Sequence, residues 1–167
     1  MNQLYQQFTA FFEKHEWNFH QFKDRPVLHT HFIGQHAQWL GVAVARPEDG
    51  CIAFLSIFPS RVPEARRAAC AELLTRLNYR LRHGSFQMDM EDGEVQFATS
   101  LMLPTKEATP EQVEHLVMIN VGTMDDRYDT LMKVIHGGVS PKVAVAQRKK
   151  PARKSKASAA KPRFELN

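Results

Sequence analysis

The stretch RLNYRLRHGSFQMDMEDGEVQFATSLMLP, from Arg76 to Pro104, is typical of a helix end, a glycine stop and two strands joined by a tight turn. Gly84 favours the left-handed conformation that ends many helices. Asp92-Gly93 is a favoured pair for a two-residue type I′ hairpin. A hairpin centred there pairs Glu91 with Glu94, Met90 with Val95, Met88 with Phe97 and Phe86 with Thr99. The stretch therefore predicts a helix followed by an antiparallel hairpin.

The carboxylates of this hairpin are expected to face water. Successive strand residues point to opposite sides, so the predicted register separates an apolar from a polar face. The apolar face holds Phe86, Met88, Met90, Val95 and Phe97, and the polar face holds Gln87, Asp89, Glu91, Glu94 and Gln96. We therefore interpret Asp89, Glu91 and Glu94 as solvated residues without a catalytic or metal-binding role.

Four strand-like runs precede this stretch. They are WNFHQF (17–22), VLHTHFIG (27–34), AQWLGVAVAR (37–46) and CIAFLSIF (51–58). The last two runs are apolar on both alternating faces. Such strands are usually covered on both sides, either by helices of the same chain or by a second copy. We predict a homodimer on this basis.

Amphipathic periodicity predicts three helices. Leu4, Phe8, Phe11 and Phe12 form one stripe of a helix from Asn2 to His15. A second helix begins near Pro63 and ends at Gly84, with an apolar stripe of Cys70, Leu73, Leu74, Leu77 and Leu81. A third begins at Thr109, which with Gln112 resembles a capping box, and runs to Gly137-Gly138. Gly122 is a position where the third helix is expected to bend or break.

The second helix carries an arginine-rich face, made of Arg66, Arg67, Arg76, Arg80 and Arg82. Such a face is open to a nucleic-acid interpretation. Glu64 and Glu72 interrupt it, however, and Glu72 is placed to pair with Arg76 one turn later. A solvated helix face is the favoured interpretation.

Basic residues are concentrated at the end of the chain. Of 22 Lys and Arg and 18 Asp and Glu, eight basic residues and one acid follow Gln147, which leaves 14 basic and 17 acidic residues in Met1–Ala146. The segment from Gln147 onward lacks periodicity and has too few apolar residues to fold alone. We predict a domain at residues 1–140 and a basic disordered tail at 141–167. Weak nucleic-acid or anion binding is expected at Arg148, Lys149, Lys150, Arg153, Lys154 and Lys156.

No residue set indicates a reaction. The sequence lacks a phosphate-binding glycine loop, a dinucleotide fingerprint and a GxSxG nucleophile motif. Cys51 and Cys70 lie in apolar segments without zinc-ligand spacing and are expected to be buried free thiols. His29 and His31 share a strand face, but no third metal ligand is evident. We predict no enzymatic activity, no cofactor and no metal site.

The sequence also indicates a location. No uninterrupted apolar run approaches the roughly 18 residues that a membrane-spanning helix needs. The first residues are polar and amphipathic, unlike a signal peptide. A cytoplasmic protein without a membrane span is expected.

One set of residues between about Gln38 and Gly138 forms a recognisable pattern: Pro63, Leu77-Asn78, Gly84, Phe86, Asp89, Asp92-Gly93, Val95, Ser100 and Tyr128. In these residues the chain resembles the YbjN family of bacterial sensory transduction regulators. The resemblance implies an α+β fold similar to type III secretion chaperones, often dimeric, with helices packed on a twisted antiparallel sheet. The implied element order is α-β-β-β-α-β-β-α. No catalytic residues come with the resemblance.

Two functions follow as hypotheses. The first is a chaperone-like or regulatory module that binds a protein partner through an apolar sheet or helix surface, with Trp39, Phe54 and Phe58 as candidate anchors. The alternative for each of these three aromatics is a place in the core. The second hypothesis is a nucleic-acid-associated protein that binds phosphate backbones through its basic tail.

Overall fold

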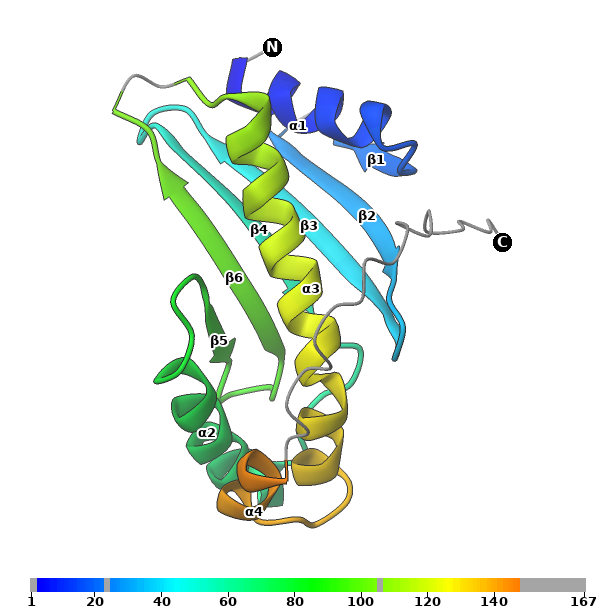
Figure 1. Ribbon diagram of the computed structural model, residues 1–167, viewed down its shortest axis with the longest axis vertical. Coiled ribbons are helices and arrows are strands. Elements are labelled where there is room, and N and C mark those ends of the chain that lie inside the picture. Colours follow the sequence, from blue (N-terminus) through cyan, green and yellow to red (C-terminus); the bar gives the residue numbers. More distant parts are fainter. Residues whose placement is uncertain (1–2, 23–24, 105–106, 148–167) are drawn as a thin grey trace.

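The computed structural model describes residues 3–22, 25–104 and 107–147, which contain a six-stranded antiparallel sheet (Figure 1). The strands are β1 (Phe19–Gln21), β2 (Val27–Ile33), β3 (Gln38–Arg46), β4 (Cys51–Ile57), β5 (Ser85–Met88) and β6 (Val95–Met102). Their order across the sheet is β1-β2-β3-β4-β6-β5, and each neighbouring pair is antiparallel. The predicted α+β class with a twisted antiparallel sheet is confirmed.

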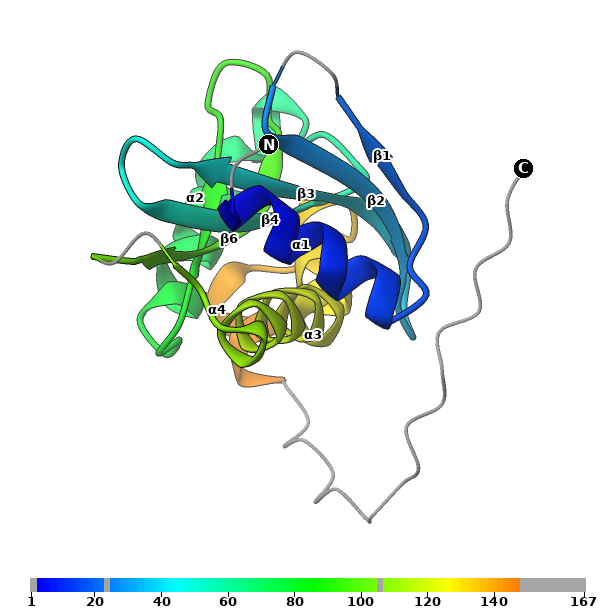
Figure 2. The same ribbon diagram turned by 90° about the horizontal axis from the view of Figure 1, so that it is seen from above.

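Four helices accompany the sheet: α1 (Gln3–Lys14), α2 (Glu64–Asn78), α3 (Pro110–Ile135) and α4 (Pro141–Ala146). Figure 2 shows α1 and α3 together on one side of the sheet. In Figure 1, α2 and α4 pack together at the lower end of the molecule, beyond the sheet. The predicted apolar stripe of α1 is buried: Leu4, Phe8, Phe11 and Phe12 are each at most 5% exposed.

Helix α3 forms because its N-terminus is capped and its apolar stripe faces the sheet. The Thr109 hydroxyl accepts the Gln112 backbone N–H, and the Gln112 side chain accepts the Thr109 N–H, which completes the predicted capping box. The helix continues without a break through Gly122, where added side-chain atoms would meet nothing within 4 Å. The helix therefore does not break at Gly122.

Polar side chains fix α2 to its neighbours. Arg66 donates to the Val134 carbonyl from Nε at 3.1 Å, at the C-terminal end of α3. Arg67 donates to the Met90 carbonyl at 2.9 Å. Asn78 bonds both the N–H and the carbonyl of Phe86, which holds β5 against the end of α2. Part of the predicted solvated arginine face thus stabilises the packing of elements that are distant in sequence.

The predicted hairpin exists, but its register and loop differ. Met88 pairs with Val95 and Phe86 with Phe97, which is two residues from the predicted register. Met90 is consequently 53% exposed in the loop rather than on the apolar face. The Asp89 and Asp92 carboxylates accept the N–H groups of Glu91 and Glu94, so side-chain bonds support a wider loop than a two-residue turn.

A two-residue shift preserves the alternation of faces, because the side-chain period of a strand is two. Phe86, Val95 and Phe97 are therefore buried as predicted. Asp89 and Glu91 are exposed and Glu94 is half-exposed, also as predicted. The register was wrong because the loop is fixed by a distant segment: the Val62 N–H donates to the Gly93 carbonyl at 2.8 Å.

Element order and element ends also differ from the expectation. The structure adds β1 to the implied α-β-β-β-α-β-β-α order, and a short helix, α4, follows α3. Helix α2 ends at Asn78, before Gly84, although Gly84 has the expected positive φ of 72°. Pro141 and Ala144 of α4 are buried, so the folded part passes residue 140, where we placed the boundary. The rest of the predicted tail, residues 148–167, lies outside the described residues.

Candidate protein-binding site

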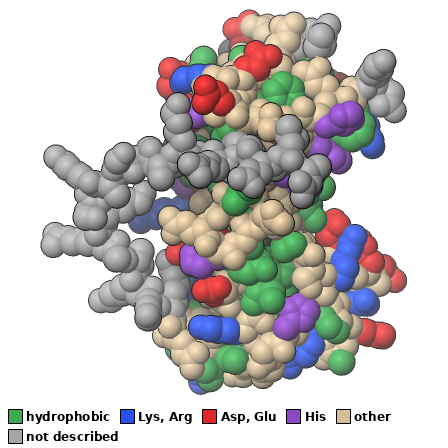
Figure 3. All heavy atoms as spheres, turned by 90° about the vertical axis from the view of Figure 1, so that its right-hand side faces the viewer, with side chains coloured by type: hydrophobic (Ala, Val, Ile, Leu, Met, Phe, Trp, Pro, Cys, Tyr) green, Lys and Arg blue, Asp and Glu red, His purple; other side chains and the backbone are tan. Residues whose placement is uncertain are grey.

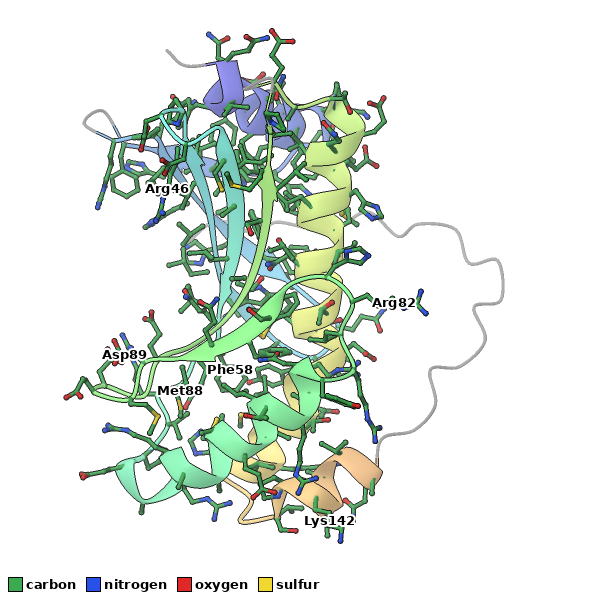
Figure 4. All side chains as sticks on the ribbon, turned by 90° about the vertical axis from the view of Figure 1, so that its left-hand side faces the viewer. Arg46, Phe58, Arg82, Met88, Asp89 and Lys142 are labelled. Atoms are coloured by element: carbon green, nitrogen blue, oxygen red, sulfur yellow. The ribbon has the colours of Figure 1, made fainter. Side chains whose placement is uncertain are left out.

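The sheet has one face covered by helices and one open face. Along β3 and β4 burial alternates strictly, with every second side chain fully buried beneath α1 and α3 and those between only half-buried. The strand registers align these half-buried positions across the sheet. Figure 4 shows Arg46 on the side of the sheet away from α3. Within residues 3–22, 25–104 and 107–147, no helix lies over this face.

The centre of the open face is apolar. We define the open face by its central residues Leu40, Val42, Val44, Ala53, Leu55, Ile57 and Ala98. Three strands at about 4.8 Å spacing, each contributing roughly 17 Å of length, give a patch on the order of 250 Å². Apolar patches of a few hundred Å² are among the largest that monomeric proteins expose, and such patches are often functional.

Polar side chains surround this apolar centre. His29 and His31 border it on β2, and Gln96 and Ser100 border it on β6. The pKa of His29 is held below its usual value, first by partial burial and then by the nearby positive charges of Arg25 and neighbouring histidines. An apolar centre with a polar rim is the usual anatomy of a protein interface.

A buried polar cluster holds the opposite face to α3. The Trp39 indole N–H donates to the Ser56 hydroxyl at 2.8 Å, and Ser56 donates to Asn120 Oδ1 at 2.6 Å. Asn120 Nδ2 donates in turn to the Phe54 and Phe97 carbonyls at 2.7 and 2.9 Å. Each of these buried groups has a partner, so the cluster fixes α3 on the sheet.

The three aromatic residues predicted as partner anchors lie in the core. Trp39 is 2% exposed, Phe54 0% and Phe58 3%. Trp39 and Phe54 point toward the helices because their places in β3 and β4 belong to the covered face. Phe58 packs on Tyr128 of α3, with ring centroids 5.2 Å apart. These residues were predicted as anchors on the assumption that they are exposed, and their burial corrects that prediction. The apolar surface available to a partner is formed instead by the alternate residues of β3 and β4, which point to the open face.

The remaining candidate residues fall into three groups. The predicted anion-binding residues Arg148, Lys149, Lys150, Arg153, Lys154 and Lys156 lie outside the described residues. His29 and His31 lie together on β2, and no three His, Cys, Asp or Glu side chains among the described residues are placed to hold a metal ion. Cys70 is buried and Cys51 is half-buried, and neither forms a disulfide.

One serine–histidine contact invites a test for catalysis. The Ser60 hydroxyl lies 2.8 Å from His136 Nε2, and both side chains are exposed. A serine nucleophile needs a base that a third group orients. Among the described residues, no carboxylate is bonded to the second ring nitrogen of His136. The pair is a surface hydrogen bond near the C-terminal end of α3.

Surface charge is mixed on the face seen in Figure 3. Lys and Arg side chains lie among Asp and Glu side chains there. Ion pairs also mix the two charges elsewhere among the described residues: Arg61 pairs with Asp92 at 2.6 Å and Glu94 at 3.0 Å, and Arg76 pairs with Glu72 at 2.7 Å as predicted. This arrangement differs from the continuous basic stripe that follows a phosphate backbone.

Among the helices of the described residues, none is both long and apolar enough to cross a bilayer.

The comparisons with known proteins agree with this fold. A family model named YbjN, with the description "Putative bacterial sensory transduction regulator", matches residues 5–132. Among solved structures, the chain is similar to "YbjN, a putative transcription regulator from E. coli", with a TM-score of 0.56 and 15% identity. That match covers 80% of this chain and 90% of the other, and at this identity it shows the fold alone. The comparison with curated proteins gave no match.

Proposed function

The chain belongs to the YbjN family, and we propose that it is a non-enzymatic, protein-binding regulatory module that uses its open face as an interface. One observation carries the proposal: seven apolar side chains of β3, β4 and β6 lie together on a sheet face without helix cover in the described residues. Removing an apolar face of this kind from water is favourable by about 25 cal/mol per Å² of buried area.

The occupant that we propose for the open face is a second copy of the chain. Val42 and Leu55 face each other at the middle of the patch, with Ala98 beside Leu55. A two-fold axis through this centre would bring the apolar residues of one copy onto those of the other, as in most homodimers. The polar side chains of β2 and β6 would then form the rim. The family resemblance to dimeric modules supports the same assembly.

The test is the mass of the full-length protein in solution. We expect light scattering after size exclusion to give two chains per particle at micromolar concentration. Leu55→Asp should give one chain per particle, because it places a charge at the centre of the open face. Met118→Asp is the matched control, since Met118 is 48% exposed on α3, and it should leave the mass at two chains.

Single-chain mass for the wild-type protein would contradict the second copy as the occupant. Cys51 provides an independent readout, because it belongs to the exposed side of β4 and pairs with Met102 at the border of the open face. Its alkylation should be slower in the wild-type protein than in Leu55→Asp. Equal rates in the two proteins would place the interface elsewhere.

Nucleic-acid binding through the tail is the second candidate function. It is favoured by the eight basic residues and single acid that follow Gln147. Such a segment would neutralise phosphates without reading bases. This function and the expected cytoplasmic location are predictions from the sequence.

A further inference from the structure

Strand β6 has a free edge over half its length. β4 pairs with β6 from Gln96 to Met102, but β5 pairs only with Val95 to Ala98. The chain turns away from β6 at Gly84, whose φ is +72° and whose added Cβ would lie 2.6 Å from the Ala98 carbonyl oxygen. Within the described residues, no strand lies beside Thr99–Met102 on the side away from β4.

The free edge presents backbone hydrogen-bonding groups. On the β5 side, the Glu94 carbonyl accepts the Asp89 N–H, whereas the Val95 carbonyl accepts from Phe58 on the β4 side. Antiparallel strands alternate these directions residue by residue. The N–H and carbonyl groups of Ser100 and Met102 therefore point toward the free edge. Ser100 is exposed and Met102 is 65% exposed, so this edge is accessible.

A groove lies directly beside this edge. It has a volume of ≈ 620 Å³ and is formed by β6, the first half of α3 and the segment before β5. Its apolar lining comes from Leu101, Leu116 and Ile119, of which Leu116 is 8% exposed. This volume falls within the range of about 300–1,000 Å³ that is typical of binding pockets. The groove is large enough for apolar side chains of an extended chain.

Charged side chains of both signs, Arg82 and Glu111, line the groove. Arg82, His83 and His115 line it, and the two imidazole rings are 6.3 Å apart. In Figure 4 the Arg82 side chain extends outward beside α3. Arg82 is exposed, and among the described residues it forms no ion pair. Glu111 lies in the first turn of α3, and its pKa is lowered by its own backbone N–H and by the Thr109 hydroxyl.

From this geometry we propose that the β6 edge and the adjoining groove bind an extended peptide segment of a partner protein. The peptide adds to the sheet as a strand beside Ser100 and Met102, with its main chain bonded to theirs. Alternate side chains, which are apolar, occupy the groove against Leu116 and Ile119. An acidic residue of the peptide pairs with Arg82. The inference adds a second binding surface to the proposed function and does not depend on the open face.

The test uses two labelled heptapeptides of alternating valine and threonine, one with a terminal aspartate and the other with a lysine in its place. Fluorescence anisotropy with the full-length protein should give at least tenfold tighter binding of the aspartate peptide. Arg82→Glu should reverse that preference. Hydrogen exchange at the Ser100 and Met102 amides should slow when the aspartate peptide is bound, because new main-chain bonds protect these groups.

Ser100→Pro tests the strand addition itself. It removes the N–H that points to the free edge and leaves the bonds between β4 and β6, and edge strands tolerate proline at such positions. We expect a loss of at least tenfold in affinity for both peptides with an unchanged melting temperature. If the melting temperature of Ser100→Pro falls, Met102→Pro at the end of β6 serves as the test variant instead. An unchanged hydrogen-exchange rate of the Ser100 amide in the wild-type protein with bound peptide would contradict the proposal.

Three further outcomes are decisive. No binding of either peptide at millimolar concentration would overturn the proposal. Binding that appears only after residues 148–167 are removed would assign the groove to the chain's own tail and would also overturn it. Leu55→Asp should bind the aspartate peptide as the wild-type protein does, and a loss in this variant would place the peptide on the open face instead.

Discussion

At the scale of single residues, Asn120 links the sheet to the helix above it. Its side chain is fully buried and accepts from Ser56 while it donates to two strand carbonyls. A polar residue in an apolar helix stripe is a weak sequence signal, since a buried amide needs partners that come from distant strands. The cluster explains why Trp39 points inward: its indole N–H has its partner there.

Gly93 is the glycine where substitution should be most damaging. Its φ is +78°, and an added Cβ would lie 2.3 Å from the Val62 carbonyl oxygen. Gly93→Val should lower the free energy of unfolding by about 3 kcal/mol, from backbone strain and the clash with Val62 together. Gly138→Val is the matched control, because Gly138 has a φ of +67° but open space around it. Urea denaturation should show a clearly smaller loss of unfolding free energy for the control. Equal losses in the two variants would show that the clash with Val62 does not cause the destabilisation.

The two thiols should differ in reactivity. Burial raises the pKa of the Cys70 thiol to about 11, although Arg66 opposes the shift. In Leu55→Asp, a disulfide reagent at pH 8 should label Cys51 quickly and Cys70 only after denaturant is added. As the pH rises past the ordinary pKa of a thiol, Cys70 ionises in the unfolded chain while it stays protonated in the folded chain. The contribution of Cys70 to stability is therefore complete below the ordinary thiol pKa and is lost as the pH rises toward 11. Rapid labelling of both thiols would contradict its burial.

At the scale of elements, α3 shows how packing overrides a local weakness. Glycine in a helix interior is unfavourable by nearly 1 kcal/mol relative to alanine. Gly122 is nevertheless accommodated, because Val121 and Met124 on either side of it are buried against the rest of the molecule. The hairpin shows the same effect, since contacts between its loop and Val62 select a register other than the one favoured by Asp92-Gly93.

Gly122→Ala should stabilise the protein. The position is exposed, helical and free of neighbours within 4 Å of an added Cβ. We expect the free energy of unfolding to increase by about 0.8 kcal/mol. Gly41→Ala is the control of opposite sign, because its Cβ would lie 2.7 Å from the Phe54 ring. A destabilised Gly122→Ala would indicate that this part of α3 requires glycine for another reason, and thermal unfolding of the three proteins decides it.

At the scale of the whole molecule, the placement of the helices decides which surfaces are available. α1 and α3 occupy one face of the sheet, and α2 with α4 closes one end (Figures 1 and 2). This arrangement leaves the open face and the β6 edge as two adjoining surfaces, with Ser100 at the border of both. The sequence adds a third property, the separation of charge between a net acidic Met1–Ala146 and the basic residues after it.

The basic tail should bind duplex DNA weakly and without base preference. If about six phosphates are neutralised, the slope of log affinity against log salt should be about −5, and binding should largely vanish between about 50 and 200 mM salt. Filter binding of a random duplex should show retention by the full chain and none by a chain that ends at Ala146. Equal retention by both chains would exclude the tail as the binding segment. A lower melting temperature after truncation would contradict the prediction that this segment contributes little to the fold.

The sequence by itself determined the elements and their faces. Periodicity identified α1, α3 and the strands, and the capping box at Thr109 was correct to the residue. The two-sided apolar character of β3 and β4 predicted cover on both faces, by helices or by a second copy, and in the described residues helices cover one face. These patterns can be recognised in the sequence because helical and strand periodicity depends only on residues a few positions apart. For the same reason the apolar face of the hairpin was correct for Phe86, Val95 and Phe97 despite the wrong register.

Only the tertiary structure decided which apolar side chains face the core and which remain available. Trp39, Phe54 and Phe58 are buried because α1 and α3 lie on their side of the sheet, and nothing within β3 or β4 distinguishes the two sides. The loop at Gly93, the ends of α2 and the free edge of β6 likewise depend on contacts between residues far apart in the chain. Such contacts are selected by the free energy of the whole fold, so a local pattern identifies an apolar strand without identifying its covered face.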